Sequence, residues 1–216
     1  MSFTKLQQRL QGIYELELEH QVNDFIVTSR EQLRPGIESY INARETLLVC
    51  QDDDDLLLSL YLHEGVVNNL VQDDGDLHLH NDNIEDFCLA LEGVSHFIYL
   101  AWNAGFQRCV TRLEMEIQAE IDKFIMLSNL LINSREQPDP GRLRRLLFDA
   151  VQFSRGLSVT ERARYRDANN FAAKYCWYLE TNGFLKQGLE QVLLRELRRF
   201  YRLDLRGKLR RIDCFH

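Results

Sequence analysis

Glu92 and His96 are the residues of this sequence whose types and spacing are best suited to chemistry. They lie one helical turn apart in its most apolar stretch, DFCLALEGVSHFIYLAWNAGF, at 86–106. Glu116 and Glu120 repeat the four-residue spacing further along the chain. Because residues four apart share one face of a helix, each pair is expected to point in one direction.

A metal or acid–base site would result if these two segments form neighbouring antiparallel helices. Three carboxylates and one imidazole would suit iron, manganese or zinc, and a carboxylate beside an imidazole can transfer protons. The alternative is structural: Glu92 and His96 form a hydrogen-bonded pair, while Glu116 and Glu120 face solvent near Arg112 and Lys123. The sequence therefore gives Glu92, His96, Glu116 and Glu120 as candidate metal ligands.

A second candidate site is a basic segment close to the C-terminus. Four arginines share one face of a predicted helix: Arg195, Arg199, Arg202 and Arg206. Lys208, Arg210 and Arg211 extend the positive charge, and Phe200 and Tyr201 could stack on bases. Three interpretations remain open for this face: a solvated or internally paired surface, a binding site for an acidic protein, and a nucleic-acid site.

Two acidic stretches are expected to be solvated rather than to bind metal. The segment QDDGDLHLHND contains His78 and His80, which would point the same way on a strand, but its acidic spacing does not fit an EF-hand. The run Asp52–Asp55 is expected to lie in the turn of a hairpin. Cys176 is expected to be a buried core residue, with a nucleophilic role as the alternative.

The expected fold is α+β and predominantly α, a helical bundle with a small β-hairpin or sheet element in the N-terminal half. Residues 46–62 predict the hairpin, and the first 33 residues read mainly as helix, with a strand at 13–19 as an alternative. Ser158 and Glu161 predict a capping box. Further helices are predicted by apolar periodicity at 64–71, 84–104, 111–133, 141–154, 159–181 and 184–206.

Composition and charge favour one cytoplasmic domain over residues 1–216, made of an acidic part at 1–83 and a helical bundle at 84–216. The net charge is −7; residues 1–108 hold 6 basic and 19 acidic residues, whereas 109–216 hold 20 and 14. Five cysteines without a CxxC pair favour a reducing compartment. No apolar run reaches the ~18 residues of a membrane span, and no signal-peptide core is seen.

These observations favour a non-catalytic helical protein that acts through protein–protein interaction. Phosphate-binding loops, dinucleotide fingerprints and nucleophile elbows are absent from the sequence. The expected partner is a second copy of the chain or an acidic protein, with nucleic acid a less favoured alternative. The rival hypothesis from a different class is a metal-dependent or acid–base enzyme that uses the Glu/His residues.

Overall fold

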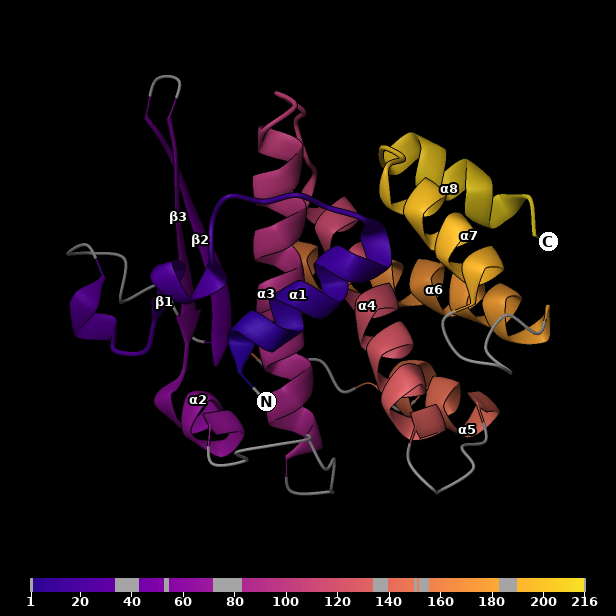
Figure 1. Cartoon of the computed structure of the whole chain (residues 1–216), viewed down its shortest axis with the longest axis horizontal. Helices are drawn as coiled ribbons and strands as arrows, with labels where there is room; N and C mark the ends of the chain where they lie inside the picture. The colour runs from indigo at the N-terminus through magenta and orange to yellow at the C-terminus, as the bar shows by residue number, and fades with distance from the viewer. Residues whose placement is uncertain are drawn as a thin grey trace. The chain divides into compact units, whose positions relative to one another are not determined.

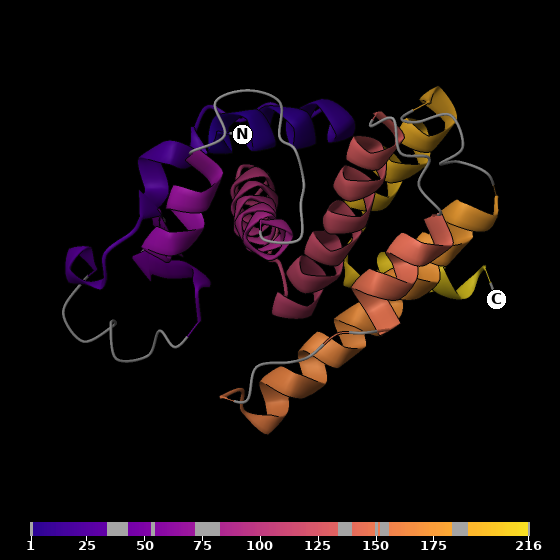
Figure 2. The ribbon, with the colours of Figure 1, turned by 90° about the horizontal axis from the view of Figure 1, so that it is seen from below.

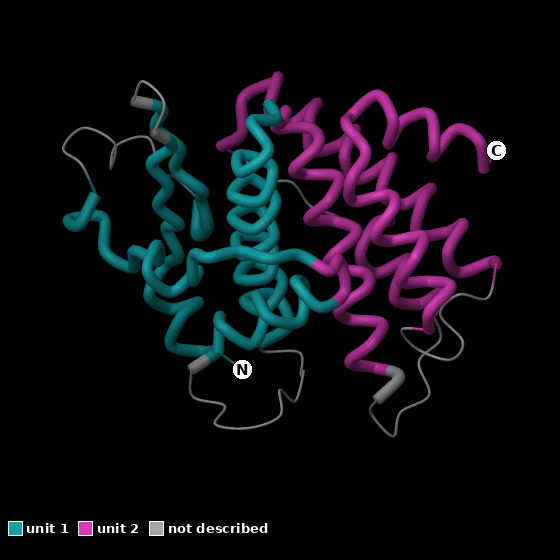
Figure 3. Tube along the Cα trace, turned by 45° about the horizontal axis from the view of Figure 1, so that its top comes forward, with its two compact units in different colours: residues 1–12, 16–109 teal, residues 13–15, 110–216 magenta. Residues whose placement is uncertain are grey.

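The computed structural model describes most of the chain in two compact units, which Figure 3 colours separately. Unit 1 comprises residues 1–12 and 16–109, and unit 2 comprises residues 13–15 and 110–216. The described residues are 2–33, 43–52, 55–71, 83–133, 140–149, 151, 156–182 and 190–215.

Unit 1 contains a small mixed sheet in the strand order β1-β3-β2. Strands β2 (Glu45–Asp52) and β3 (Asp55–Leu62) form an antiparallel hairpin, in which Glu45 pairs with Leu62 and Asp52 with Asp55. The two-residue strand β1 (Ile26–Val27) pairs in parallel with β3. Because a two-stranded ribbon alone is barely stable, the hairpin depends on what packs against it.

The long helix α3 (Ile84–Ala104) supplies that packing. It lies against both strands of the hairpin, and the short helix α2 (Glu64–Val71) also contacts it (Figures 1 and 2). Phe87, Leu91, Val94 and Ile98 recur at helical spacing and are all buried. This stripe explains why the segment forms a helix and which face it buries.

Unit 2 is helical in its described residues. Helix α4 (Arg112–Asn133) packs along α6 (Val159–Thr181), and α5 (Pro140–Arg144) continues into a π-helical turn at Arg145–Asp149. Two short helices follow, α7 (Gln191–Tyr201) and α8 (Leu205–Asp213). Ser158 and Glu161 form the expected capping box at the start of α6.

The predicted fold class is confirmed: the protein is predominantly helical, with a small sheet in its N-terminal half. The hairpin and the helices predicted at 64–71, 84–104, 111–133 and 159–181 agree with the structure to within one residue at each end. The helix predicted at 141–154 is shorter, because α5 ends at Arg144 and a π turn follows it.

Two predicted elements are wrong. Helix α1 (Phe3–Tyr14) ends well before residue 33, no strand forms at 13–19, and 3-10 turns and β1 follow instead. The helix predicted at 184–206 is broken in its described part, since α7 ends at Tyr201 and α8 begins at Leu205. The Asp204 side chain accepts a hydrogen bond of 2.7 Å from the Gly207 amide, which starts a new helix there.

No helix in the described ranges combines the length and the apolar character needed to span a membrane.

Candidate functional site

Three arginines of α7 and α8 serve the fold of unit 2. Arg198 Nε donates to the carbonyl of Ile13 at 2.9 Å, and its guanidinium pairs with Glu15 at 2.7 Å. Arg202 donates to the carbonyls of Tyr14 at 3.0 Å and Glu15 at 3.2 Å. Since helices end in carbonyls that lack intrahelical partners, these two arginines cap α1. Arg202, although one of the predicted binding residues, therefore has a structural role.

Arg211 is the third structural arginine. Its guanidinium makes hydrogen bonds of 3.0 and 2.7 Å to the two carboxylate oxygens of Glu196, which joins α8 to α7. This bond is the main reason that the pKa of Arg211 is raised from its ordinary value. The bidentate geometry is the strongest arrangement available to an arginine and a carboxylate.

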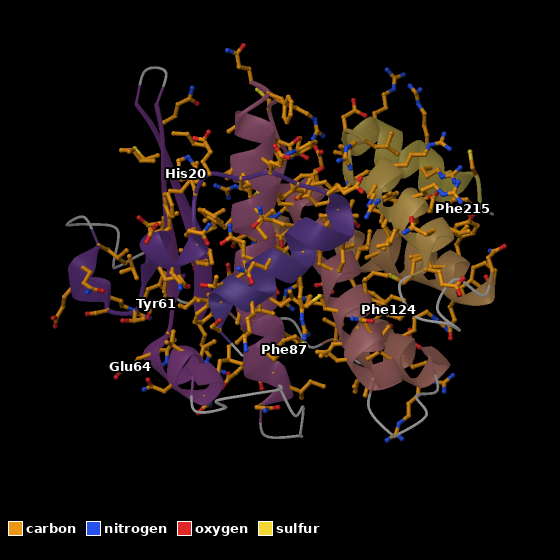
Figure 4. The ribbon with its side chains drawn as sticks, viewed as in Figure 1. His20, Tyr61, Glu64, Phe87, Phe124 and Phe215 are labelled. Carbon is orange, nitrogen blue, oxygen red and sulfur yellow. The ribbon has the colours of Figure 1, made fainter. Side chains whose placement is uncertain are left out.

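Other arginines of the same two helices point away from the fold. We call four exposed residues the arginine surface: Arg195, Arg199, Arg206 and Arg210. Arg195 contacts a carbonyl of its own helix at 3.3 Å, and none of the four forms an ion pair within the described part of the chain. Figure 4 shows nitrogen-tipped side chains extending outward from this helical pair.

The arginine surface lies opposite the buried faces of its helices. In α7 the buried residues Leu193, Leu197 and Phe200 recur at helical spacing, which leaves Arg195 and Arg199 on the solvent side. In α8, Lys208 and Ile212 are buried, and Arg206 and Arg210 are exposed. Each helix thus presents two arginines to solvent.

The expectation that Phe200, Tyr201 and Lys208 extend a binding surface is wrong, because the fold buries all three. Phe200 stacks on Tyr175 with ring centroids 4.0 Å apart, and Tyr201 stacks on Tyr14 at 4.2 Å. The sequence could not show this, because the rings that cover them come from distant segments. For Phe200, the apolar spacing that it shares with Leu193 and Leu197 is a local signal of burial.

The second candidate site lies in unit 1, where a third residue joins Glu92 and His96. Glu45, the first residue of β2, approaches α3 so that its Oε1 lies 3.7 Å from Nδ1 of His96. One ligand atom from each of Glu45, Glu92 and His96 lies within 4.8 Å of the other two. The side chains of His96 and Glu45 are 7% and 9% exposed, so these two are largely shielded from water, whereas Glu92 is half-buried.

Gly93 makes this approach possible. A Cβ atom at position 93 would lie 2.8 Å from Leu60 Cδ1 and 3.1 Å from Glu45 Cγ, closer than side chains normally pack. Arg44, the residue before Glu45, also reaches α3, where its guanidinium pairs with Asp86 at 2.5 Å. A glycine inside a buried helix often marks such a close approach. Gly93 was therefore the sequence signal that another segment of the chain packs beside Glu92.

The other two predicted ligands, Glu116 and Glu120, belong to unit 2 and have basic neighbours there. Glu116 lies 3.5 Å from the guanidinium of Arg164 on α6. Glu120 lies 2.7 Å from the ammonium of Lys123, one turn further along α4. Both glutamates thus contact basic side chains, and the four-residue cluster of Glu92, His96, Glu116 and Glu120 stays a prediction.

The remaining sequence candidates contribute no described site. His78 and His80 lie outside the described residues, as do Asp53 and Asp54 of the acidic run. Cys176 is completely buried, and this burial is the main reason that the pKa of its thiol is raised well above the ordinary value. A buried thiol with a raised pKa stays protonated and is a poor nucleophile.

No protein family model matches this chain, and no characterised protein or solved structure is significantly similar to it.

Proposed function

We propose that this protein is a non-catalytic cytoplasmic protein that self-associates through its arginine surface. The observation that carries the proposal is that the arginines of α7, α8 and the turn between them fall into two groups, one structural and one exposed. Three of them hold the fold together, whereas the arginine surface places four cations on short, well-packed helices, and these cations form no ion pair with any residue in the described ranges. Uncompensated like charges repel one another, so a partner that neutralises them gains electrostatic energy.

The complementary charge is present in the same chain. Residues 1–108 carry 6 basic and 19 acidic side chains. We call one part of this half the acidic segment; its exposed residues are Glu17, Glu19, Asp24 and Glu31. None of them forms an ion pair with another described residue. The proposed contact joins the arginine surface of one copy to the acidic segment of another.

A two-fold dimer is the simplest assembly with this contact. Each copy offers both surfaces, so a symmetric pair forms the contact twice. Phe200 and Tyr201 are inaccessible for stacking on bases, and the whole chain is anionic with a net charge of −7. Both facts favour an acidic protein surface over nucleic acid as the occupant.

The proposed cytoplasmic location rests on the cysteines. Cys50, Cys109 and Cys214 are exposed, and all five cysteines of the chain are free thiols. Exposed free thiols persist where the environment is reducing.

Light scattering during size-exclusion chromatography tests the proposal. The 25.5 kDa chain should run as a dimer at about 50 mM salt and as a monomer at about 500 mM, because salt screens exposed charges. The variant Arg199→Glu/Arg206→Glu should be monomeric at both concentrations. The control Arg112→Glu/Arg166→Glu changes two other exposed arginines of unit 2 by the same charge and should still dimerise.

Two results would contradict the proposal. One is a wild-type protein that is monomeric at low salt. The other is a single-stranded oligonucleotide that binds the wild type and is lost in Arg199→Glu/Arg206→Glu, since this result would assign the arginine surface to nucleic acid.

A further inference from the structure

Glu45, Glu92 and His96 bring two carboxylates and one imidazole together in unit 1. One ligand atom of each lies within 4.8 Å of the others, although Glu45 comes from β2 and the other two from α3. We propose that these three side chains bind a divalent transition-metal ion, which ties the start of β2 to the middle of α3. This site is independent of the self-association proposed above, since it uses other residues and another readout.

The first support is electrostatic. Glu45 is largely buried and Glu92 is half-buried, and two carboxylates a few ångströms apart repel each other, so a divalent cation between them is favourable. Arg44, the residue before Glu45, pairs with Asp86 at 2.5 Å and with Glu85 at 3.5 Å, which holds the start of β2 against α3. A divalent ion would compensate both carboxylates at once and would leave His96 neutral.

The second support is the chemistry of the donors. Two carboxylate oxygens and one imidazole nitrogen suit Mn²⁺, Fe²⁺, Co²⁺ and Zn²⁺, whereas Mg²⁺ and Ca²⁺ prefer oxygen alone. Ligand atoms that share one ion at ~2.1 Å lie at most about 4.2 Å apart. Side-chain rotations that move the ligand atoms by less than about 1 Å would therefore bring all three within reach of one ion.

The third support is the way in which the backbone prepares the group. Gly93 follows Glu92 directly and leaves room for Glu45, whose Oε1 would lie 3.2 Å from a Cβ atom at that position. Glu92 and His96 are one turn apart on a helix that is packed along the hairpin. All three donors are thus mounted on regular elements rather than on loops, which limits their movement.

The test is titration of the metal-free protein with Co²⁺, followed by absorption spectroscopy and thermal unfolding. The wild type should bind one ion per chain and unfold at a higher temperature when Co²⁺ is present, because the ion binds the folded state. The same concentration of Mg²⁺ should leave the unfolding temperature unchanged. His96→Gln and Glu45→Gln should each bind Co²⁺ at least about tenfold more weakly.

Matched controls separate this site from binding at exposed side chains. His20→Gln and Glu64→Gln change the same residue types at exposed positions of unit 1, both labelled in Figure 4. Both controls should bind Co²⁺ like the wild type. Circular dichroism checks that each variant is folded, and wild-type protein with ¹⁵N-labelled histidine gives a second readout: Zn²⁺ should shift one imidazole resonance.

Three results would overturn the proposal. They are no stoichiometric Co²⁺ binding by the wild type, equal affinity in folded His96→Gln, and an equal response to Mg²⁺. The first would mean that a hydrogen-bonded imidazole, not a metal ion, links the two carboxylates.

Discussion

The ammonium group of Lys208 donates a hydrogen bond of 2.7 Å to the side-chain oxygen of Gln118 in the interior of unit 2. Lys208 and Gln118 are 0% and 1% exposed. The Gln118 amide in turn donates to the hydroxyl of Tyr14 and to Asp122, and Tyr14 donates to Asp122. Burial, followed by Asp122, raises the pKa of Tyr14 well above its ordinary value. This network joins α1, α4 and α8.

Replacing the lysine should destabilise unit 2. In Lys208→Ala the oxygen of Gln118 and the carbonyl of Phe200, which Lys208 also contacts at 3.2 Å, lose a charged donor. Because buried polar groups without their partners are costly, we expect the free energy of unfolding to fall by about 2–4 kcal/mol. Urea unfolding measures this loss. The exposed control Lys5→Ala should change it by less than about 0.5 kcal/mol.

Gly93→Ala should destabilise unit 1 through overpacking. The added methyl group would meet Leu60 and Glu45 at distances that force one of them to move. We expect a loss of about 1–3 kcal/mol in urea unfolding. Gly12→Ala is the matched control: position 12 lies in α1 with open space around it, so the change should stabilise by up to about 1 kcal/mol. Equal effects at both positions would refute the close approach of Glu45.

Ser158→Ala should weaken the cap of α6 in a pH-dependent way. The hydroxyl and the backbone amide of Ser158 lower the pKa of Glu161 from its ordinary value of 4.5. A lowered pKa in the folded state gives stability that is present above the unfolded pKa and is lost as pH falls through the folded one. The variant should therefore lose about 1 kcal/mol near pH 7, and less at acidic pH.

Ser29→Ala provides the comparison for that measurement. Ser29 forms a capping box with Gln32, which has no titratable group. Ser29→Ala should therefore lower the free energy of unfolding by the same amount near pH 7 and at acidic pH. A pH-independent effect of Ser158→Ala would contradict the role of the Glu161 carboxylate.

The sequence predicted those elements whose signals are local. The apolar stripe of α3 and the capping box of Ser158 lie within a few turns of the residues they order, so the observed bounds agree closely with the predicted ones. The break between α7 and α8 was missed, although Asp204, which caps α8, is a typical helix-starting residue. Leucines and arginines continue at helical spacing on both sides of Asp204, so their periodicity alone predicts one unbroken helix.

The candidate sites depend on contacts between distant residues, and there the sequence was less informative. Lysine is ordinarily a surface residue, yet Lys208 is buried, and Gln118, ninety positions away, accepts its hydrogen bond. Glu45 was not recognised because its position beside His96 depends on how the hairpin packs on α3. A single sequence records neither of these pairings.

Mixing two complementary variants tests the self-association most directly. Arg199→Glu/Arg206→Glu reverses two charges of the arginine surface, and Asp24→Arg/Glu31→Arg reverses two charges of the acidic segment. Reversing two of four charges leaves the altered surface without net charge, so both contacts lose their attraction in either protein alone. The mixed pair keeps one unaltered contact between four arginines and four carboxylates, and its other contact joins the two surfaces whose charges were both reversed. Light scattering at low salt should show two monomers when they are measured separately and a dimer in the equimolar mixture. A mixture that stays monomeric, or either variant dimerising alone, would contradict the account.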